Sequence, residues 1–425
     1  MPRERIRVRP FSLNIGDIFM KVKAFKAWRP AEGKAELVAS VPYDVVDTRQ
    51  AAELAAGNPD SFLHVVRAEI DLPEGTNPYC DEVYAQAKAN LERLKTDGVL
   101  IREEQPSIYL YSQQMGEHVQ YGIVATCHVE DYETGKIKIH EKTRRVKEED
   151  RIRYVDTQNA NTGPVFLAYR DSEKINKVVE AVKSTEPLYK FTAEDGVAHT
   201  VWKFEDPAVL EEAFGEIPAT YVADGHHRSA SAAKIGAMRR AANPNHTGDE
   251  PYNYFLAVMF PESELKILAY NRVILSLPGT KDEFCSALKD HFTIEANGIA
   301  SPRKAGEICM YIDGVWSTLT PKYLPNESDP VAVLDVSILQ NDVLAPILNI
   351  EDPRESNDID FVGGIKGTAE LEKWVKDGRA ELAFSMYPTS MEQLFAVADA
   401  GMLMPPKSTW FEPKLRSGLL VNTLD

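Results

Sequence analysis

Cysteine, basic charge and long apolar runs are all scarce in this sequence. Its 425 residues include four cysteines, which lie far apart and form no Cys-x-x-Cys pair. Widely spaced thiols of this kind indicate a reduced, cytoplasmic protein rather than a disulfide framework. The longest strongly apolar window, 252–260, is about half of the roughly 20 residues that a membrane helix needs. We therefore expect a cytoplasmic protein without a membrane partner.

Basic residues are also outnumbered by acidic ones. Lys and Arg total 48 against 65 Asp and Glu, so the formal net charge is −17. Nucleic-acid binding draws its affinity from phosphate neutralisation by Lys and Arg, and no helix-turn-helix pattern is evident. Nucleic acid is therefore not an expected partner, whereas a homo-oligomer is compatible with the sequence. Apolar residues at 44% and charged residues at 27% are ordinary for a globular chain.

Strand-like and helix-like patterns alternate along the chain and predict the α/β or α+β class, with a mixed sheet. Apolar positions 83, 87, 91 and 94 share one helical face, and Gly98 marks the end of that helix. Further helical stripes cover 175–182 and 371–375. Strands are predicted at 37–41, 62–66, 107–111, 121–127, 165–169, 200–204, 220–222, 254–260 and 267–273.

Breaks rich in Pro, Gly and polar residues suggest three α/β units. We place them at 20–105, 106–275 and 276–425, and the pattern leaves open that the first two share one sheet. A strand-like pattern begins at Met20. The basic stretch before it is too short and polar for a secretory signal, so residues 1–19 are expected to be an extension outside the fold.

The most informative segment is Asp224-Gly225-His226-His227-Arg228, which lies between a short apolar strand and an alanine-rich helix. A helix that starts directly after a glycine presents free N–H groups and a positive dipole end to an anion. Arg228 and the two histidines are suited to bind phosphate, and Asp224 is suited to Mg²⁺. Two other interpretations remain: Asp224 as a simple helix cap, and a zinc site, although zincin helices space their histidines by three residues.

This motif resembles the Asp-Gly-His-His-Arg element of ParB/sulfiredoxin-fold proteins, especially the free-serine kinases. Over about 20–422, the chain also resembles a prokaryotic domain-of-unknown-function family with a SpoOJ/ParB-like label. Matching segments include 41–45, 140–143, 161–166 and 405–409. The resemblance implies a ParB/sulfiredoxin-like central unit and a nucleotide cofactor, ATP or ADP, with Mg²⁺.

The pair His140-Glu141 matches the His-Glu pair of those kinases, which implies that Glu141 is the general base. A carboxylate within reach of the attacking hydroxyl suits phosphoryl transfer. The interval from Glu141 to Asp224 is roughly twice that of the compact kinases, so residues 155–205 are expected to be an insertion that loops out. Most of the charged run 144–153 is expected to be a solvated helix laced with ion pairs.

Weaker candidates lie near both ends of the chain. The segment 401–409 resembles a phosphate-binding P-loop, but Pro406 stands where glycine is required, so we reject a P-loop. Lys407, Ser408, Thr409 and Asp44 are candidate substrate-binding residues. For each of them, a purely structural role in a turn or a docked C-terminal segment is an equal or stronger alternative.

Together these features predict a nucleotide-dependent phosphotransferase that acts on a small hydroxylated metabolite, with free serine as the specific candidate. Glu141 and Asp224 would be its catalytic residues, and residues 225–228 would bind the nucleotide phosphates. The alternative is a non-catalytic switch protein of ParB-like type that binds a nucleotide or another anion.

Overall fold

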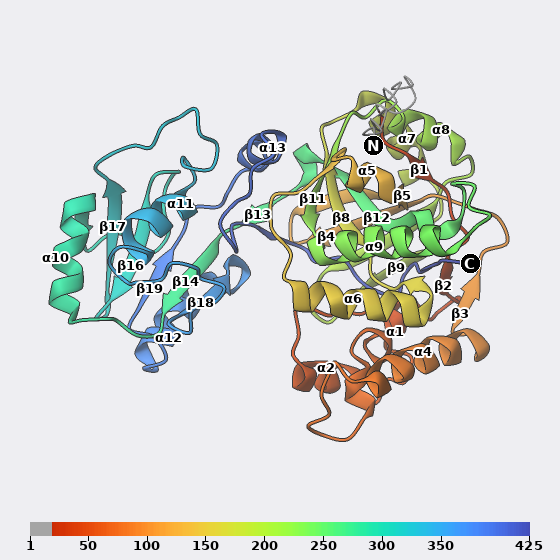
Figure 1. The fold of residues 1–425 in the computed structure, drawn as a ribbon, viewed down its shortest axis with the longest axis horizontal. Helices are drawn as coiled ribbons and strands as arrows, with labels where there is room; N and C mark the ends of the chain where they lie inside the picture. Colours follow the sequence, from red (N-terminus) through yellow and green to blue (C-terminus); the bar gives the residue numbers. More distant parts are fainter. Residues whose placement is uncertain (1–18) are drawn as a thin grey trace, which may run out of the picture.

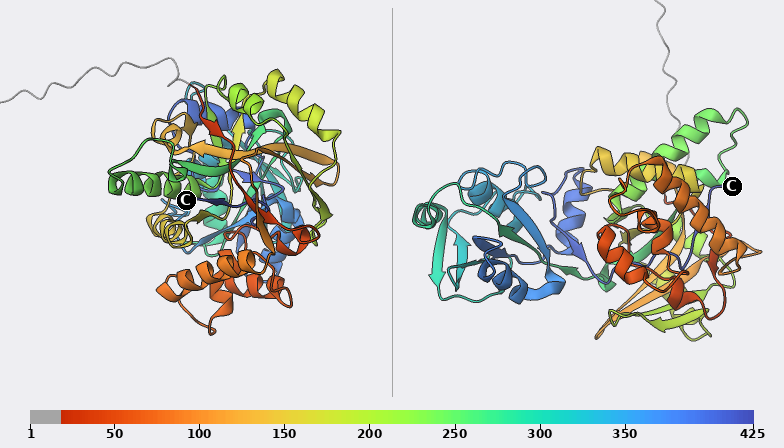
Figure 2. Two further views of the ribbon diagram at one scale, coloured as in Figure 1. Left: turned by 90° about the vertical axis from the view of Figure 1, so that its right-hand side faces the viewer. Right: turned by 90° about the horizontal axis from the view of Figure 1, so that it is seen from below.

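The computed structural model describes residues 19–425, so residues 1–18 of the predicted extension lie outside it. The chain forms two lobes, each built on its own β-sheet (Figures 1 and 2). The larger sheet has nine strands and the smaller has six. The mixed α/β class predicted from the sequence is confirmed. Within the described residues, no helix has the length and apolarity needed to span a membrane.

The nine-stranded sheet combines parallel and antiparallel pairs. Its order is β6-β11-β8-β12-β5-β4-β10-β9, and β1 pairs with β5. The pairs β6–β11 and β8–β12 are parallel. The strands are β1 Val22–Lys23, β4 Tyr109–Met115, β5 His118–His128, β6 Ile137–Lys138, β8 Val165–Tyr169, β9 Tyr189–Thr192, β10 Ala198–Lys203, β11 Thr220–Asp224 and β12 Tyr254–Pro261.

Both faces of this sheet are covered, which explains why its central strands are apolar throughout. Alternate residues of β8 show the division: Val165 and Leu167 face one apolar cluster, whereas Phe166 and Ala168 face another. Helices contribute to the first cluster, and the C-terminal segment contributes to the second. The contributing helices are α5 Val129–Glu133, α7 Glu173–Lys183, α8 Ala208–Phe214 and α9 His226–Ala242.

The N-terminal part of the chain is mainly helical and packs on α6 (Arg145–Gln158), as Figure 1 shows. It comprises β2 Trp28–Pro30, α1 Ala35–Val38, α2 Thr48–Ala55, α3 Leu63–Val66, α4 Asp81–Thr96 and β3 Leu100–Arg102. The helix predicted around 83–94 is confirmed by α4. The strands predicted at 37–41 and 62–66 are wrong, because short apolar runs carry no period that separates a buried strand from a buried helical turn.

One expectation about the middle of the chain is also wrong. Residues 155–205 do not loop out: they supply β8, β9 and β10 to the nine-stranded sheet. Most of the charged run 144–153 is exposed, as expected, but Glu148, Asp150 and Arg151 are buried. Arg151 stacks 3.8 Å from the ring centroid of Tyr43, and Tyr84 donates to Asp150 at 2.9 Å. Tertiary partners make these charges part of the core.

The smaller lobe carries the sheet β15-β17-β16-β19-β14-β18. Its strands are β14 Tyr270–Ile274, β15 Phe292–Ala296, β16 Ile308–Ile312, β17 Val315–Pro321, β18 Ile359–Gly363 and β19 Leu382–Ser385. Its helices are α10 Lys281–His291, α11 Asp335–Leu339, α12 Gly367–Lys376 and α13 Met391–Asp399. Helix α13 contacts the larger sheet, because Phe395 stacks on Tyr221 with ring centroids 3.8 Å apart.

The C-terminal segment returns from the smaller lobe to the larger one. Strand β20 (Trp410–Phe411) pairs with β13 (Ile267–Leu268), and β21 (Asn422–Thr423) pairs with β7 (Ala160–Asn161). Every residue from 415 to 424 is buried. One cluster of buried apolar side chains therefore extends through both lobes. The division of the chain near 105 and 275 stays a prediction.

Candidate functional site

The site lies at one edge of the nine-stranded sheet. Strands β6 and β11 are parallel neighbours, so the residues that follow each of them meet at the same edge. His140 and Glu141 come shortly after β6, and Asp224 ends β11. Strand β8 runs antiparallel to β11, so the segment before it, which contains Pro164, reaches this edge as well. The topology thus brings together the Glu141 and Asp224 regions, which are far apart in sequence.

The turn from β11 into α9 requires a glycine. The register of β11 against β8 shifts between Val222 and Asp224, and Gly225 then adopts φ +95°. A Cβ at Gly225 would lie 3.0 Å from Arg228 Nε. No side chain caps the start of α9, so its first N–H groups are free to bind an anion.

Close packing fixes the position of α9. Its inward side carries small residues, among them Ala232, Ala233 and Gly236. A Cβ at Gly236 would lie 3.0 Å from Val129 Cγ2 and 3.1 Å from the Tyr252 carbonyl oxygen. The backbone of α9 therefore lies in close contact with Val129 and Tyr252. This packing fixes the position of the helix N-terminus.

A cavity of about 580 Å³ opens in front of this N-terminus. Its volume is in the range of small-molecule sites. Six Lys or Arg residues and four Asp or Glu residues line it, a local basic excess in a chain of net charge −17. The basic residues are Arg67, Lys142, Arg144, Lys147, Arg354 and Lys407, and the acidic residues are Asp44, Asp47, Glu141 and Asp224. Gly225, His226 and His227 also line it. A cavity of this charge favours an anionic ligand.

Two cations hold Asp224 in its charged form. Lys414 Nζ lies 3.2 Å from Asp224 Oδ2, and an Arg228 guanidinium nitrogen lies 3.7 Å from Oδ1. Burial alone would raise the pKa of Asp224, but Lys414 and Arg228 bring it below its ordinary value. Arg228 is not among the residues that line the cavity. Its guanidinium is buried, donates to the Pro164 carbonyl oxygen and pairs with Asp44 at 3.8 Å.

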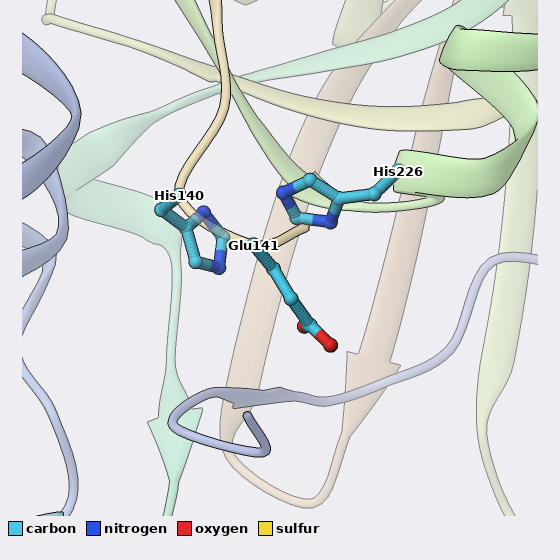
Figure 3. A group of neighbouring side chains, drawn as sticks. All are labelled: His140, Glu141 and His226. Atoms are coloured by element: carbon cyan, nitrogen blue, oxygen red, sulfur yellow. The ribbon is translucent and has the colours of Figure 1, made fainter. Parts of the chain in front are cut away.

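Glu141 lines the same cavity as Asp224, and burial raises the pKa of its carboxyl above the ordinary value. Lys407 and Glu141 attract each other, and this attraction helps to raise the pKa of Lys407 although burial opposes it. The rings of His140 and His226 lie on either side of the Glu141 backbone in the view of Figure 3, with centroids 4.6 Å apart. Burial lowers the pKa of His140 to about 4 and also lowers the pKa of His226, so both imidazoles are neutral.

The residues predicted near the two ends of the chain have different placements. Asp44 and Lys407 line the cavity. Ser408 does not, because it is buried and donates its hydroxyl to the Pro405 carbonyl oxygen at 2.6 Å. Thr409 contacts the site indirectly, since its Oγ1 lies 3.2 Å from His140 Nε2.

Sequence reasoning missed several residues of the site. Lys142, Arg144 and Lys147 follow Glu141 in sequence, but the charge pattern over 144–153 indicates a solvated helix rather than a cavity wall. No motif marks Arg67 or Arg354, which come from distant parts of the chain. Only the folded structure reveals them.

Comparison with known families gives one decisive match. A family model described as "Protein of unknown function (DUF1015)" covers residues 22–337 of the 425. The chain belongs to the DUF1015 family. No curated protein matches this DUF1015 chain.

Solved structures resemble the DUF1015 chain weakly. One is a free serine kinase variant in complex with AMP, with a TM-score of 0.36 and 15% identity over 71% of this chain and 92% of that chain. Another is a conserved hypothetical protein from Pyrococcus furiosus, with a TM-score of 0.35 and 15% identity over 71% of this chain and 94% of that chain. A third is C-terminally truncated SbnI from Staphylococcus aureus, with a TM-score of 0.37 and 12% identity over 68% of this chain and 82% of that chain. Likeness at this level carries no argument about function.

Proposed function

We propose that this protein is a nucleotide-dependent phosphotransferase that acts on a small hydroxylated metabolite, with free serine as the specific candidate. The observation that carries the proposal is the cavity of about 580 Å³, in which the N-terminus of α9 and Glu141 face the same space. Phosphoryl transfer depends mainly on positioning and charge neutralisation. An anion-binding helix end and a buried carboxylate in one cavity are suited to that reaction.

The nucleotide phosphates would bind at the start of α9. The free N–H groups after Gly225 and the positive end of the helix dipole favour negative charge there. No ion pair of residues 19–425 includes Lys142 or Arg144, so both cations are available to a ligand. In this proposal Arg228 acts from beneath the cavity, where it holds Asp44 and Asp224 rather than the phosphates.

Asp224 fits a role in holding Mg²⁺. This ion takes oxygen ligands and is usually bound by one or two carboxylates together with substrate phosphates. Asp224 supplies such a carboxylate at the cavity wall, and its low pKa keeps that carboxylate charged. Bound Mg²⁺ with ATP or ADP would supply the transferable phosphoryl group and neutralise its charge. The chain itself contributes the position of the phosphates and the removal of the acceptor proton.

Glu141 would accept the proton of the substrate hydroxyl on a carboxylate oxygen. Burial raises its pKa, which makes the carboxylate a stronger base than a solvated glutamate. Lys407 stabilises the ionised form. Burial and Lys407 therefore act on the pKa of Glu141 in opposite directions, and the effect of burial is the larger.

Phosphorus NMR on the purified protein with Mg²⁺, ATP or ADP and a panel of amino acids and sugars tests the proposal. We expect a new phosphomonoester that disappears in Glu141→Gln while nucleotide binding is retained. Glu262→Gln is the matched control, because burial also raises the pKa of Glu262 and this residue lies outside the cavity. Its turnover should equal that of the unsubstituted protein.

The nucleotide site has its own test. Asp224→Ala and Arg228→Ala should each weaken nucleotide affinity, the second by releasing Asp44 and Asp224. Unchanged affinity in both variants would contradict the assignment of this site. Tight nucleotide binding without any turnover would instead favour the non-catalytic switch.

A further inference from the structure

His140 and His226 come from different segments of the chain, yet their imidazole rings meet beside Glu141. Their rings meet edge to face at 4.6 Å. One nitrogen of each ring and one carboxylate oxygen of Glu141 lie within 4.8 Å of one another. The adjacent pair His226-His227, which the sequence displays, does not form this group. The three side chains are shown together in Figure 3.

His226 Nε2 is buried and has no hydrogen-bond partner within residues 19–425. His140 Nδ1 is also buried without a hydrogen bond of normal geometry, although the Val222 backbone lies close enough to raise the pKa of His140. His226 is 8% exposed and His140 is 1% exposed. Buried polar atoms without a partner are rare in folded proteins, and binding of an ion is one role that accounts for them.

We propose that His140, Glu141 and His226 bind a divalent transition-metal ion of the Zn²⁺ type. Two imidazole nitrogens and one carboxylate oxygen, with further positions open, form a typical donor set for Zn²⁺ or Fe²⁺. Mg²⁺ prefers oxygen ligands alone, so this site differs from the one proposed at Asp224. Thr409 supports the His140 ring, because its Oγ1 lies 3.2 Å from His140 Nε2 and helps to fix the orientation of the imidazole.

The site needs a small adjustment to close on an ion. Ligand atoms about 2.1 Å from a tetrahedral ion are about 3.4 Å apart, which is less than the spread of 4.8 Å. Glu141 is the member able to move, since no hydrogen bond or ion pair of residues 19–425 holds its carboxylate. Lys407, Arg144 and Arg354 are the cations that act on Glu141, whereas Lys414 and Arg228 are paired with Asp224.

Occupancy of this site has a consequence that rests on the proposed function. A carboxylate that ligates an ion is not available to accept a proton. Zn²⁺ would therefore inhibit the phosphotransferase by withdrawing Glu141, even when Mg²⁺ and nucleotide are in excess.

Equilibrium dialysis of the full-length protein, stripped of metal by chelation and then titrated with Zn²⁺ alone, tests the site without any activity assay. We expect one high-affinity ion per chain. His226→Asn and Glu141→Gln should each lower the affinity by more than the roughly 10- to 100-fold typical for loss of a supporting residue. Thr409→Val should lower it by about 10-fold. Circular dichroism of each variant checks that it is folded.

His227→Asn is the matched control, because His227 lines the same cavity but is not part of the group. Its Zn²⁺ affinity should be unchanged. The absence of a one-to-one complex would overturn the proposal, and so would an equal loss of affinity in His227→Asn and His226→Asn. Failure of the phosphorus NMR assay would leave the dialysis result intact, so the metal site and the phosphotransferase fail independently.

Discussion

Gly225→Ala should damage both the nucleotide site and the fold. At φ +95° an alanine is strained by about 1 to 2 kcal/mol. Its Cβ would also lie 3.0 Å from Arg228 Nε and 3.1 Å from Cζ, so the guanidinium would have to shift. That guanidinium is held by Pro164, Asp44 and Asp224, and a hydrogen bond to a charged group contributes about 1.5 to 3 kcal/mol. If both contributions are lost, we expect Gly225→Ala to lower the free energy of unfolding by about 2.5 to 5 kcal/mol.

Gly248→Ala provides a matched control. Gly248 has φ +102°, and a Cβ there would meet nothing within 4 Å. This variant therefore shares the backbone strain of Gly225→Ala without the contact with Arg228. It should lose only about 1 to 2 kcal/mol of unfolding free energy and no nucleotide affinity.

Urea unfolding followed by tryptophan fluorescence, together with calorimetric titration of Mg²⁺ and ADP, separates the two effects. Gly225→Ala should bind the nucleotide at least about 10-fold more weakly, equivalent to about 1.4 kcal/mol. The reasoning is refuted if the two glycine variants lose the same stability and neither loses nucleotide affinity.

Three further predictions concern pH and packing. Because the pKa of Glu141 is raised, this base becomes protonated at a higher pH than an ordinary glutamate does. As the pH is lowered, turnover should therefore begin to fall at a higher pH than it would with an ordinary glutamate base. A rate profile that is flat below neutrality would contradict this. His199, buried and bonded to Tyr111 at 2.7 Å, has a pKa lowered to about 3 by burial, so the unfolded chain binds a proton that the folded chain does not. Stability should therefore fall as the pH drops from about 6.5 towards 3, and urea titrations across this range should show a shallower fall in His199→Gln. Phe395→Ala removes the stack of α13 on Tyr221 and should lower the free energy of unfolding by about 3 to 5 kcal/mol. A loss under about 1 kcal/mol would show that this contact does not hold the two lobes together.

Local patterns determined the parts of the fold that depend on near neighbours in sequence. The apolar runs at 165–169 and 254–260 predict strands because both faces of those strands are buried. The stripe that ends at Gly98 predicts α4. The transition from strand to glycine to alanine-rich helix predicts the turn at Gly225, because few other local structures need those residues in that order. The net charge of −17 argued against nucleic acid as a partner, but neither charge nor composition could place a single side chain.

Long-range pairing decided the rest. Strand β6 has two residues and no pattern of its own, yet its parallel pairing with β11 is what places Glu141 beside Asp224. The return of the C-terminal segment brings Lys414 to Asp224 and turns Ser408 away from the cavity. Such contacts depend on the free energy of burying whole elements together, and this free energy has no local signal in the sequence. The sequence by itself therefore determined one wall of the candidate site, the start of α9, and only the tertiary structure decided what faces it.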